Sequence, residues 1–407
     1  MAQTETADSI PPQELQEIVI QAPKVIRKAD MDIYHPSKSA VEHSQNGLQL
    51  LNNLMIPTLT VSDVLGTIQA AGQSVQVRIN GRESSIEQVR TLLPETIKRV
   101  EWIDNPGLRY GGANYVLNFI VSNPTIGGSL MAQARPALNQ AWGFYMADAK
   151  FNTGRSQWEV GGNFKLTNKI KTHRDYTETF TYPDGTTLTR NETSRGGTMD
   201  NSFANAWASY SYIKPDTTVF MAEFGLFQKL TDKFLYNGLL SLSDGSDDIF
   251  LTDSHGDKGG TPSLSLYWQQ NFAHRQMLIV NFNSSFYFGR SYSDYMEQLA
   301  CATNYLTDIH TNIKDRNQAY AIEVDYIKNW RNGRFTAGTS YTANRNRSQY
   351  ESLGDDIFHQ RQDKVYLFAE YFHRFGKWTA TAGMGVQYTD FLFKETNQGS
   401  HSWSPHP

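Results

Sequence analysis

The sequence is poor in cysteine, in long apolar runs and in positive charge. Cys301 is the single cysteine among 407 residues, so no internal disulfide can form, and its neighbours lack metal-ligand spacing. No apolar run approaches the roughly 18 residues that a membrane-spanning helix needs. The formal net charge is −4, so no overall positive field exists to attract nucleic acid. A helical membrane protein is therefore excluded, and nucleic acid is not expected as a partner.

Catalytic and targeting motifs are also missing from the sequence. It contains no Gly-x-Ser-x-Gly, no His-Glu-x-x-His and no phosphate-binding glycine loop. The ten histidines are scattered, and His401 and His406 share a polar tail in which metal binding is not expected. The first residues contain neither the basic start nor the apolar core of a signal peptide, although Met1–Gln3 fit the end of a signal that begins upstream. We expect no enzyme activity, no bound metal and no cofactor.

Aromatic residues are abundant, although the sequence as a whole is not apolar. Phe, Trp and Tyr make up 13% of the chain, whereas all hydrophobic types together reach only 39%. A soluble core is more often filled with aliphatic residues. The strands of an outer-membrane barrel instead alternate lipid-facing apolar residues with polar residues, and they carry aromatic girdles at both interfaces. The composition therefore favours a transmembrane β-barrel.

The first third of the chain has a mixed pattern. Residues 1–26 are predicted to be a flexible arm, polar at first and containing one isolated β-type run at 17–22. Residues 27–123 are predicted to form a small α/β domain. Its expected helices cover 47–54 and 86–93, and its expected strands cover 75–79, 97–103 and 115–121.

Residues 124–393 follow a period of two. In 157–166, for example, Trp158, Val160 and Phe164 share one face, and polar residues share the other. In 318–328 the apolar residues at 320, 322, 324 and 326 oppose Glu323 and Asp325. We expect about eleven antiparallel strands here, with an extra hairpin possible at 234–242. Short connections, expected at 152–155, 214–216, 273–275, 329–333 and 376–377, alternate with long ones, as in outer-membrane barrels. The expected long loops cover 169–200, 229–260, 290–316 and 347–361, and 394–407 is expected to be an irregular tail.

Several ordered motifs in the first 123 residues resemble those of one family. The run formed by Glu17, Ile18, Val19, Ile20, Gln21 and Ala22 resembles a TonB box, and 77–81 resembles the turn motif Val-x-Ile-Asn-Gly. Residues 97–111 resemble a signature that ends in Asn-Pro-x-Ala-x-Tyr-Gly, with Asn105, Pro106, Tyr110 and Gly111 at the matching positions. Together they resemble the TonB-dependent receptors, and more narrowly the outer-membrane β-barrel family of such receptors common in Bacteroidetes.

The resemblance implies a mainly β fold: a small α/β plug followed by about eleven strands of a 22-strand antiparallel transmembrane barrel. It implies active uptake of a nutrient such as siderophore-bound iron, cobalamin or a glycan. The protein would lie in the outer membrane of a Gram-negative cell, with its N-terminal arm in the periplasm. Expected partners are outer-membrane lipids, the substrate, the C-terminal domain of TonB at residues 17–22, and a surface lipoprotein in the case of glycan import.

The resemblance also gives individual residues expected roles, for which simpler interpretations exist. Asn80, Gly81 and Arg82 would shape the substrate-facing apex of the plug, or they form a hairpin turn. Charged residues would lock the plug to the barrel wall, or they are solvated; they are Arg78, Arg99, Glu101 and Arg109. Apart from the resemblance, the acidic runs 244–248 and 253–257 hold carboxylates at close spacing, as calcium sites do, but their spacing does not match a calcium loop, so a solvated loop is expected.

Two other classes of protein remain compatible with the sequence. Because about half of the family's strands are missing, we expect a truncated fragment, and a nonfunctional or surface-adhesion remnant is the structural alternative. The second alternative is a soluble carbohydrate-binding β protein, which would share the alternation of residues.

Overall fold

The computed structural model describes residues 24–28, 31–62, 66–104, 106–110, 113–122, 125–214, 217–302, 304–354 and 356–406. These residues divide into two compact units. The first contains the described residues up to 104 together with Ala113–Ser122, and the second contains 106–110 and the described chain from 125 onward. No helix in these ranges is long and apolar enough to cross a membrane.

The small unit combines short helices with two small sheets. Strands β1, β2, β8, β9, β6 and β7 form the larger sheet in that order, with β6 and β9 parallel, and β3, β4 and β5 form the other. The elements are β1 (Lys24–Arg27), β2 (Asp32–His35), α1 (Lys38–Glu42), α2 (Gly47–Asn53), β3 (Leu59–Ser62), β4 (Thr67–Ala70), β5 (Gln73–Ser74), β6 (Gln76–Ile79), β7 (Arg82–Glu83), α3 (Ile86–Arg90), η1 (Pro94–Thr96), β8 (Ile97–Ile103) and β9 (Val116–Val121).

The core of the small unit forms where α2 and α3 pack on the sheet. Leu48, Val89, Val100 and Phe119 are fully buried there. Gly47 is required at the start of α2, because a Cβ atom at this position would lie only 2.4 Å from the Val89 carbonyl oxygen of α3. The predicted helices and strands of this region are confirmed, although α3 ends earlier than expected and β1 begins inside the predicted arm.

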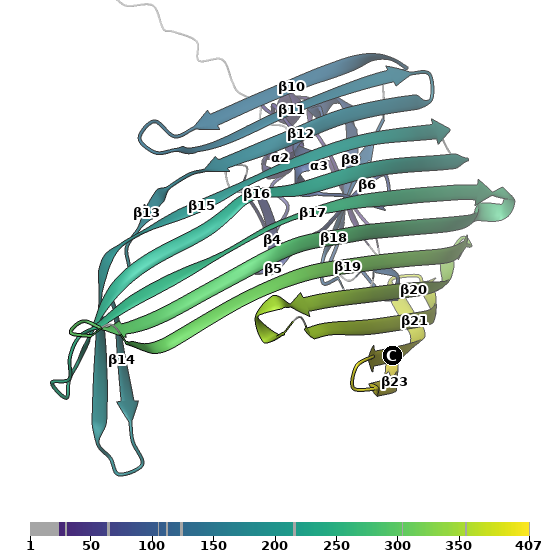
Figure 1. Cartoon of the computed structure of the whole chain (residues 1–407). Coiled ribbons are helices and arrows are strands. Elements are labelled where there is room, and N and C mark those ends of the chain that lie inside the picture. Colours follow the sequence, from purple (N-terminus) through teal and green to yellow (C-terminus); the bar gives the residue numbers. More distant parts are fainter. Residues whose placement is uncertain are drawn as a thin grey trace, which may run out of the picture. The chain divides into compact units, whose positions relative to one another are not determined.

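The large unit is one broad antiparallel sheet, in which the strands lie side by side (Figure 1). The path runs β10-β11-β12-β15-β16-β17-β18-β19-β20-β21-β22-β23, and β13 and β14 pair with β15 beyond the end of β12. Its elements are η2 (Leu108–Tyr110), β10 (Ile126–Pro136), β11 (Trp142–Thr153), β12 (Ser156–Thr167), β13 (Ile170–Thr172), β14 (Tyr176–Thr181), β15 (Thr187–Lys214), β16 (Thr218–Leu242), β17 (Ile249–Phe272), η3 (Ala273–Arg275), β18 (Gln276–Leu299), β19 (Tyr305–Asn329), β20 (Gly333–Tyr350), η4 (Glu351–Leu353), β21 (Asp356–Phe375), β22 (Trp378–Phe393) and β23 (Gln398–His406).

The prediction of a mainly β chain is confirmed, as are the eleven strands of this path up to residue 393. The short turns at 154–155, 273–275, 330–332 and 376–377 also lie where the sequence predicts them. They share one end of the sheet. We call the opposite end the extended end, because the longest strands continue toward it (Figure 1).

The predicted long loops are wrong. Strands β15 to β19 have 24 to 28 residues each, and they absorb most of 187–200, 229–260 and 290–316. The hairpin considered at 234–242 is the continuation of β16. Polar residues occupy both faces in parts of these extensions, such as 252–258, so the alternation that marks a strand is weak there in the sequence. Pairing with neighbouring strands supplies the backbone hydrogen bonds.

The predicted irregular tail is also wrong for most of its length. Residues 398–406 form β23, which pairs with β22 in antiparallel register. The segment is rich in Gly, Ser, His and Pro, which have little intrinsic preference for strands. Two features reconcile it with the fold: Trp403 packs its ring 4.8 Å from that of Tyr388, and Pro405 lies on an edge strand, where a missing amide is tolerated.

Candidate functional site

The predicted turn at 80–82 is a tight two-residue hairpin turn in the small unit. Asn80 and Gly81 have φ values of +51° and +87°, and they connect β6 with β7. Both central residues of this turn type need positive φ, which asparagine and glycine adopt most readily. The turn interpretation is therefore confirmed, and a role at a substrate-facing apex stays a prediction.

A polar network behind this turn holds it in place. The Asn118 side chain accepts a hydrogen bond from the Gly81 amide at 2.9 Å and donates one to Glu101 at 2.8 Å. Glu101 also forms a 2.9 Å ion pair with Arg99, and Arg78 donates to the Gly81 carbonyl oxygen at 2.8 Å. Three of the four charges singled out in the sequence therefore contact one another or the turn.

Replacing Asn118 by leucine, which has a similar volume, should weaken this network. The Gly81 amide would lose its acceptor and Glu101 one of its donors, at a cost of about 1–3 kcal/mol in the free energy of unfolding. Amide hydrogen exchange of the full chain should show faster exchange at Gly81. Asn114→Leu is the matched control, because Asn114 is exposed. Equal effects of the two substitutions would contradict the proposed role of the network.

The segment 106–110, which carries Pro106 and Tyr110 of the predicted signature, contacts the large sheet. Arg109 Nε lies 3.4 Å from the Asp325 carboxylate, and Asp325 is almost fully buried on β19. The Leu108 amide donates to Glu370 on β21 at 3.4 Å. Both carboxylates belong to the polar face of their strands. The sequence singled out Arg109 but not its partners, although the period of two had placed Asp325 on that face.

Apolar side chains cover one face of the large sheet in continuous rows across the strands. The row through the middle of β19 consists of Phe151, Trp158, Tyr210, Ala222, Leu266, Phe282, Ile322, Tyr341, Val365 and Tyr388. On β19 the apolar positions run from Tyr320 to Tyr326, about 20 Å at the usual rise of a strand. We call these rows the apolar band. Toward the extended end, the same face carries the charged residues Asp308, His310 and Lys314.

The opposite face is mostly polar beside the apolar band, although Met221, Tyr267, Ile279 and Ile327 form a buried apolar cluster on it. The row next to the one above consists of Asn152, Gln157, Ser211, Met221, Tyr267, Asn281, Glu323, Ser340, Tyr366 and Gln387. Charged groups on this face are arranged in pairs, such as Lys150 with Glu159 at 3.7 Å. A sheet with one apolar face and one mostly polar face separates two different environments.

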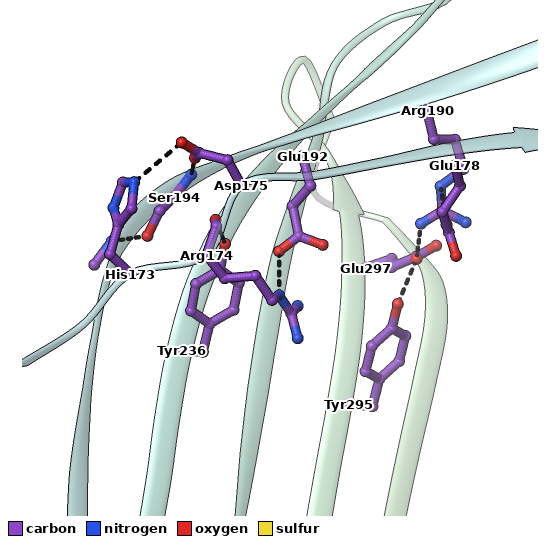
Figure 2. A network of polar contacts seen from close by, with 11 residues as sticks. His173, Arg174, Asp175, Glu178, Arg190, Glu192, Ser194, Tyr236, Tyr295 and Glu297 are labelled. Carbon is purple, nitrogen blue, oxygen red and sulfur yellow. Dashed lines mark hydrogen bonds and ion pairs between the residues drawn. The ribbon is translucent and has the colours of Figure 1, made fainter.

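A pocket of about 240 Å³ lies on the polar face at the extended end, beyond the apolar band. Its lining comes from the segment before β14 and from β14, β15, β17 and β18, and consists of Arg174, Tyr176, Glu178, Arg190, Glu192, Leu251 and Tyr295. Figure 2 shows most of these side chains gathered on neighbouring strands. Buried apolar residues of β16 and β17, including Leu240 and Leu251, support it.

Two arginines dominate the polar contacts of this pocket. Arg174 donates to Glu192 at 2.8 Å and lies over the ring of Tyr236, 4.3 Å from its centroid. Arg190 donates to Glu297 at 2.8 Å, and the Tyr295 hydroxyl donates to the same carboxylate at 2.8 Å. Burial, together with this carboxylate, raises the pKa of Tyr295 to about 12, so its phenol is protonated at neutral pH. These contacts fix the lining side chains before any ligand binds.

Several residues singled out in the sequence lie outside the described residues. They are Glu17, Ile18, Val19, Ile20, Gln21 and Ala22 of the predicted TonB box, and Asn105 and Gly111 of the signature. The pocket, conversely, was missed, because its residues lie in segments that the sequence indicated as loops. Its one signal was the clustering of Arg, Glu and Tyr between 174 and 192.

No protein-family model and no curated protein match this sequence. Among solved structures, the copper transporter OprC is similar, with 12% identity and a TM-score of 0.49 over 94% of this chain and 60% of that one. The ferric yersiniabactin uptake receptor FyuA from Yersinia pestis has 10% identity and a TM-score of 0.35, over 88% of this chain and 72% of that one. The ferric citrate transporter FecA in its unliganded form has 10% identity and a TM-score of 0.31, over 91% and 70%. The chain thus spans 60% of the length of OprC.

Proposed function

We propose that this chain is the plug domain and part of the barrel of a TonB-dependent outer-membrane receptor that takes up a small nutrient. The observation that carries the proposal is the apolar band on one face of a large antiparallel sheet whose other face is polar. Outer-membrane barrels carry an outward apolar band of about 25 Å and a polar interior. Large exposed side chains such as Trp158 and Ile322, at 52% and 42% exposure, suit contact with lipid rather than water.

The lengths of the strands fit the same proposal. A strand crosses the hydrocarbon region with roughly 9–11 residues, whereas β18 and β19 have 24 and 25. Beyond the apolar band, the same face of these strands carries polar residues such as Asp308 and Lys314. Such residues suit a segment that lies in water. In this proposal the extended end lies outside the cell and the short turns face the periplasm, where the N-terminal arm also lies.

The proposed partner in the periplasm is the C-terminal domain of TonB, bound by residues 17–22. A run of β-branched residues next to a polar arm can add a strand to the edge of another sheet through main-chain hydrogen bonds. The small unit is proposed as the plug because its turn at 80–82 and its strand β8 carry motifs that resemble those of that domain. A surface lipoprotein remains a proposed partner if the nutrient is a glycan.

Deleting residues 17–22 should abolish capture of the full chain by immobilised TonB C-terminal domain. Val19→Pro is the sharper variant, because proline removes one of the amides that strand addition uses, and at least a tenfold loss of affinity is expected. Deletion of 9–14, an equal length of the same arm, is the control and should bind normally. Capture that survives both the deletion of 17–22 and Val19→Pro would refute the proposed partner.

A further inference from the structure

The pocket at the extended end has almost balanced charge. Its two guanidinium groups, on Arg174 and Arg190, face the carboxylates of Glu178, Glu192 and Glu297. An anionic ligand would therefore meet no net positive charge. A metal cation would have to displace arginines that already hold Glu192 and Glu297 at 2.8 Å, and no metal-binding cluster occurs within the described part of the chain. The chemistry favours a neutral ligand.

The Arg190 guanidinium and the Glu178 carboxylate together fit a ligand group that can both donate and accept hydrogen bonds. Within the described residues, the Nε atom of Arg190 is buried and has no hydrogen-bond acceptor. A Glu178 carboxylate oxygen lies 3.8 Å from this atom, which is too far for a hydrogen bond. A hydroxyl group at the exposed ends of these two side chains, which are 24% and 38% exposed, would accept from the Arg190 guanidinium and donate to Glu178 at once, which neither an ammonium nor a carboxylate can do.

The rest of the lining supplies apolar surface for a small ring. Tyr176 is 54% exposed at the pocket, while Leu251 is almost fully buried. Aromatic rings of tyrosine offer a flat apolar face together with a polar tip. A volume of about 240 Å³ lies below the roughly 300–1,000 Å³ of typical ligand pockets. It suits one ring with several hydroxyl groups rather than a large chelate.

We infer that this pocket binds a neutral sugar residue, held between Arg190 and Glu178 and resting against Tyr176. The inference deepens the proposed function, on which it rests for the orientation of the pocket toward the cell exterior, by naming carbohydrate as the substrate class. Polar side chains on four rigid, hydrogen-bonded segments position the hydroxyl groups of the sugar. No covalent step is involved.

The test is binding of the full chain to an array of glycans that carries neutral glucans, mannans and galactans beside sulfated and uronate-containing chains. The protein is kept in lauryldimethylamine oxide, because maltoside and glucoside detergents present sugars of their own. The neutral oligosaccharide with the strongest signal is then titrated by calorimetry, with inorganic phosphate and citrate as competitors.

Two substitutions probe the pocket and two serve as controls. Glu178→Gln removes the charge of the acceptor without changing its size, and Arg190→Lys removes the guanidinium fork. The controls are Glu351→Gln and Arg290→Lys, which alter a 2.7 Å ion pair between η4 and β18 that does not line the pocket. Glu178 is partly exposed and lies 3.8 Å from Arg190, beyond hydrogen-bonding distance, so Glu178→Gln should leave the fold intact.

We expect neutral oligosaccharides to bind the original chain and both controls equally well. Both pocket variants should bind them at least tenfold more weakly, and phosphate and citrate should not compete. The inference is overturned if no neutral glycan binds, if the pocket variants bind as the original chain does, or if only anionic ligands bind. Its failure differs from that of the proposed function: a chain that captures TonB through residues 17–22 but binds no sugar keeps the uptake proposal and loses this one.

Discussion

Ile322→Lys should lower the free energy of unfolding of the full chain in phospholipid vesicles by about 2–4 kcal/mol, a 30- to 1,000-fold change in the folding equilibrium. Ile322 lies in the middle of the apolar band on β19, between Phe282 and Tyr341 of the neighbouring strands. A lysine there would place an ammonium group near the centre of the hydrocarbon region, too far from either interface for its four-carbon chain to reach water easily.

Ser340→Lys is the matched control for this prediction. Ser340 lies one strand away on the polar face, directly opposite Glu323. An added ammonium group there gains a carboxylate neighbour and keeps access to the polar side of the sheet, so little loss of stability is expected. Urea titration of vesicle-inserted protein, followed by tryptophan fluorescence, measures both variants. A similar loss in the two would mean that the apolar band does not face lipid.

The sequence predicts the two faces of the sheet because one of them is apolar. In 157–166 and 318–328 the alternation of apolar and polar residues gives the orientation of every side chain, and the register confirms it. The same logic fails beyond the apolar band. Asp308, His310 and Lys314 share the face that Ile322 occupies further along β19, and the residues between them are not consistently apolar. Without contrast between the faces, a paired strand looks like a loop in the sequence.

The two candidate sites differ in how far the sequence alone predicts them. The turn at Asn80 and Gly81 could be predicted, because these two residues are the ones that most readily adopt its positive φ values. The pocket could not, because Arg190 and Glu297 are separated by 107 residues. They meet only through the register of β15, β16, β17 and β18, which contains irregularities at 194–196 and 229–233. A shift of one residue at either place would turn the side chains to the other face.

Phe119→Ala should destabilise the small unit by about 3–5 kcal/mol, roughly a 150- to 5,000-fold change in its opening equilibrium. Phe119 is fully buried on β9, next to Val100 of β8 and close to the helices of the unit. Removing the ring leaves a cavity that neighbours on paired strands cannot easily fill. A unit of this size has a total stability of roughly 5–15 kcal/mol, so the loss is a large share of it.

Hydrogen exchange of the full chain, read at the amides of β8 and β9, measures this effect directly. Exchange there should accelerate by the factor expected for the loss, because these amides exchange only when the unit opens. Phe180→Ala is the control: Phe180 is 43% exposed on β14, so its removal creates no cavity. If Phe119→Ala left the protection of β8 and β9 unchanged, the small unit would not be a cooperative core. The motifs of 77–82 would then lack the rigid support that a plug role requires.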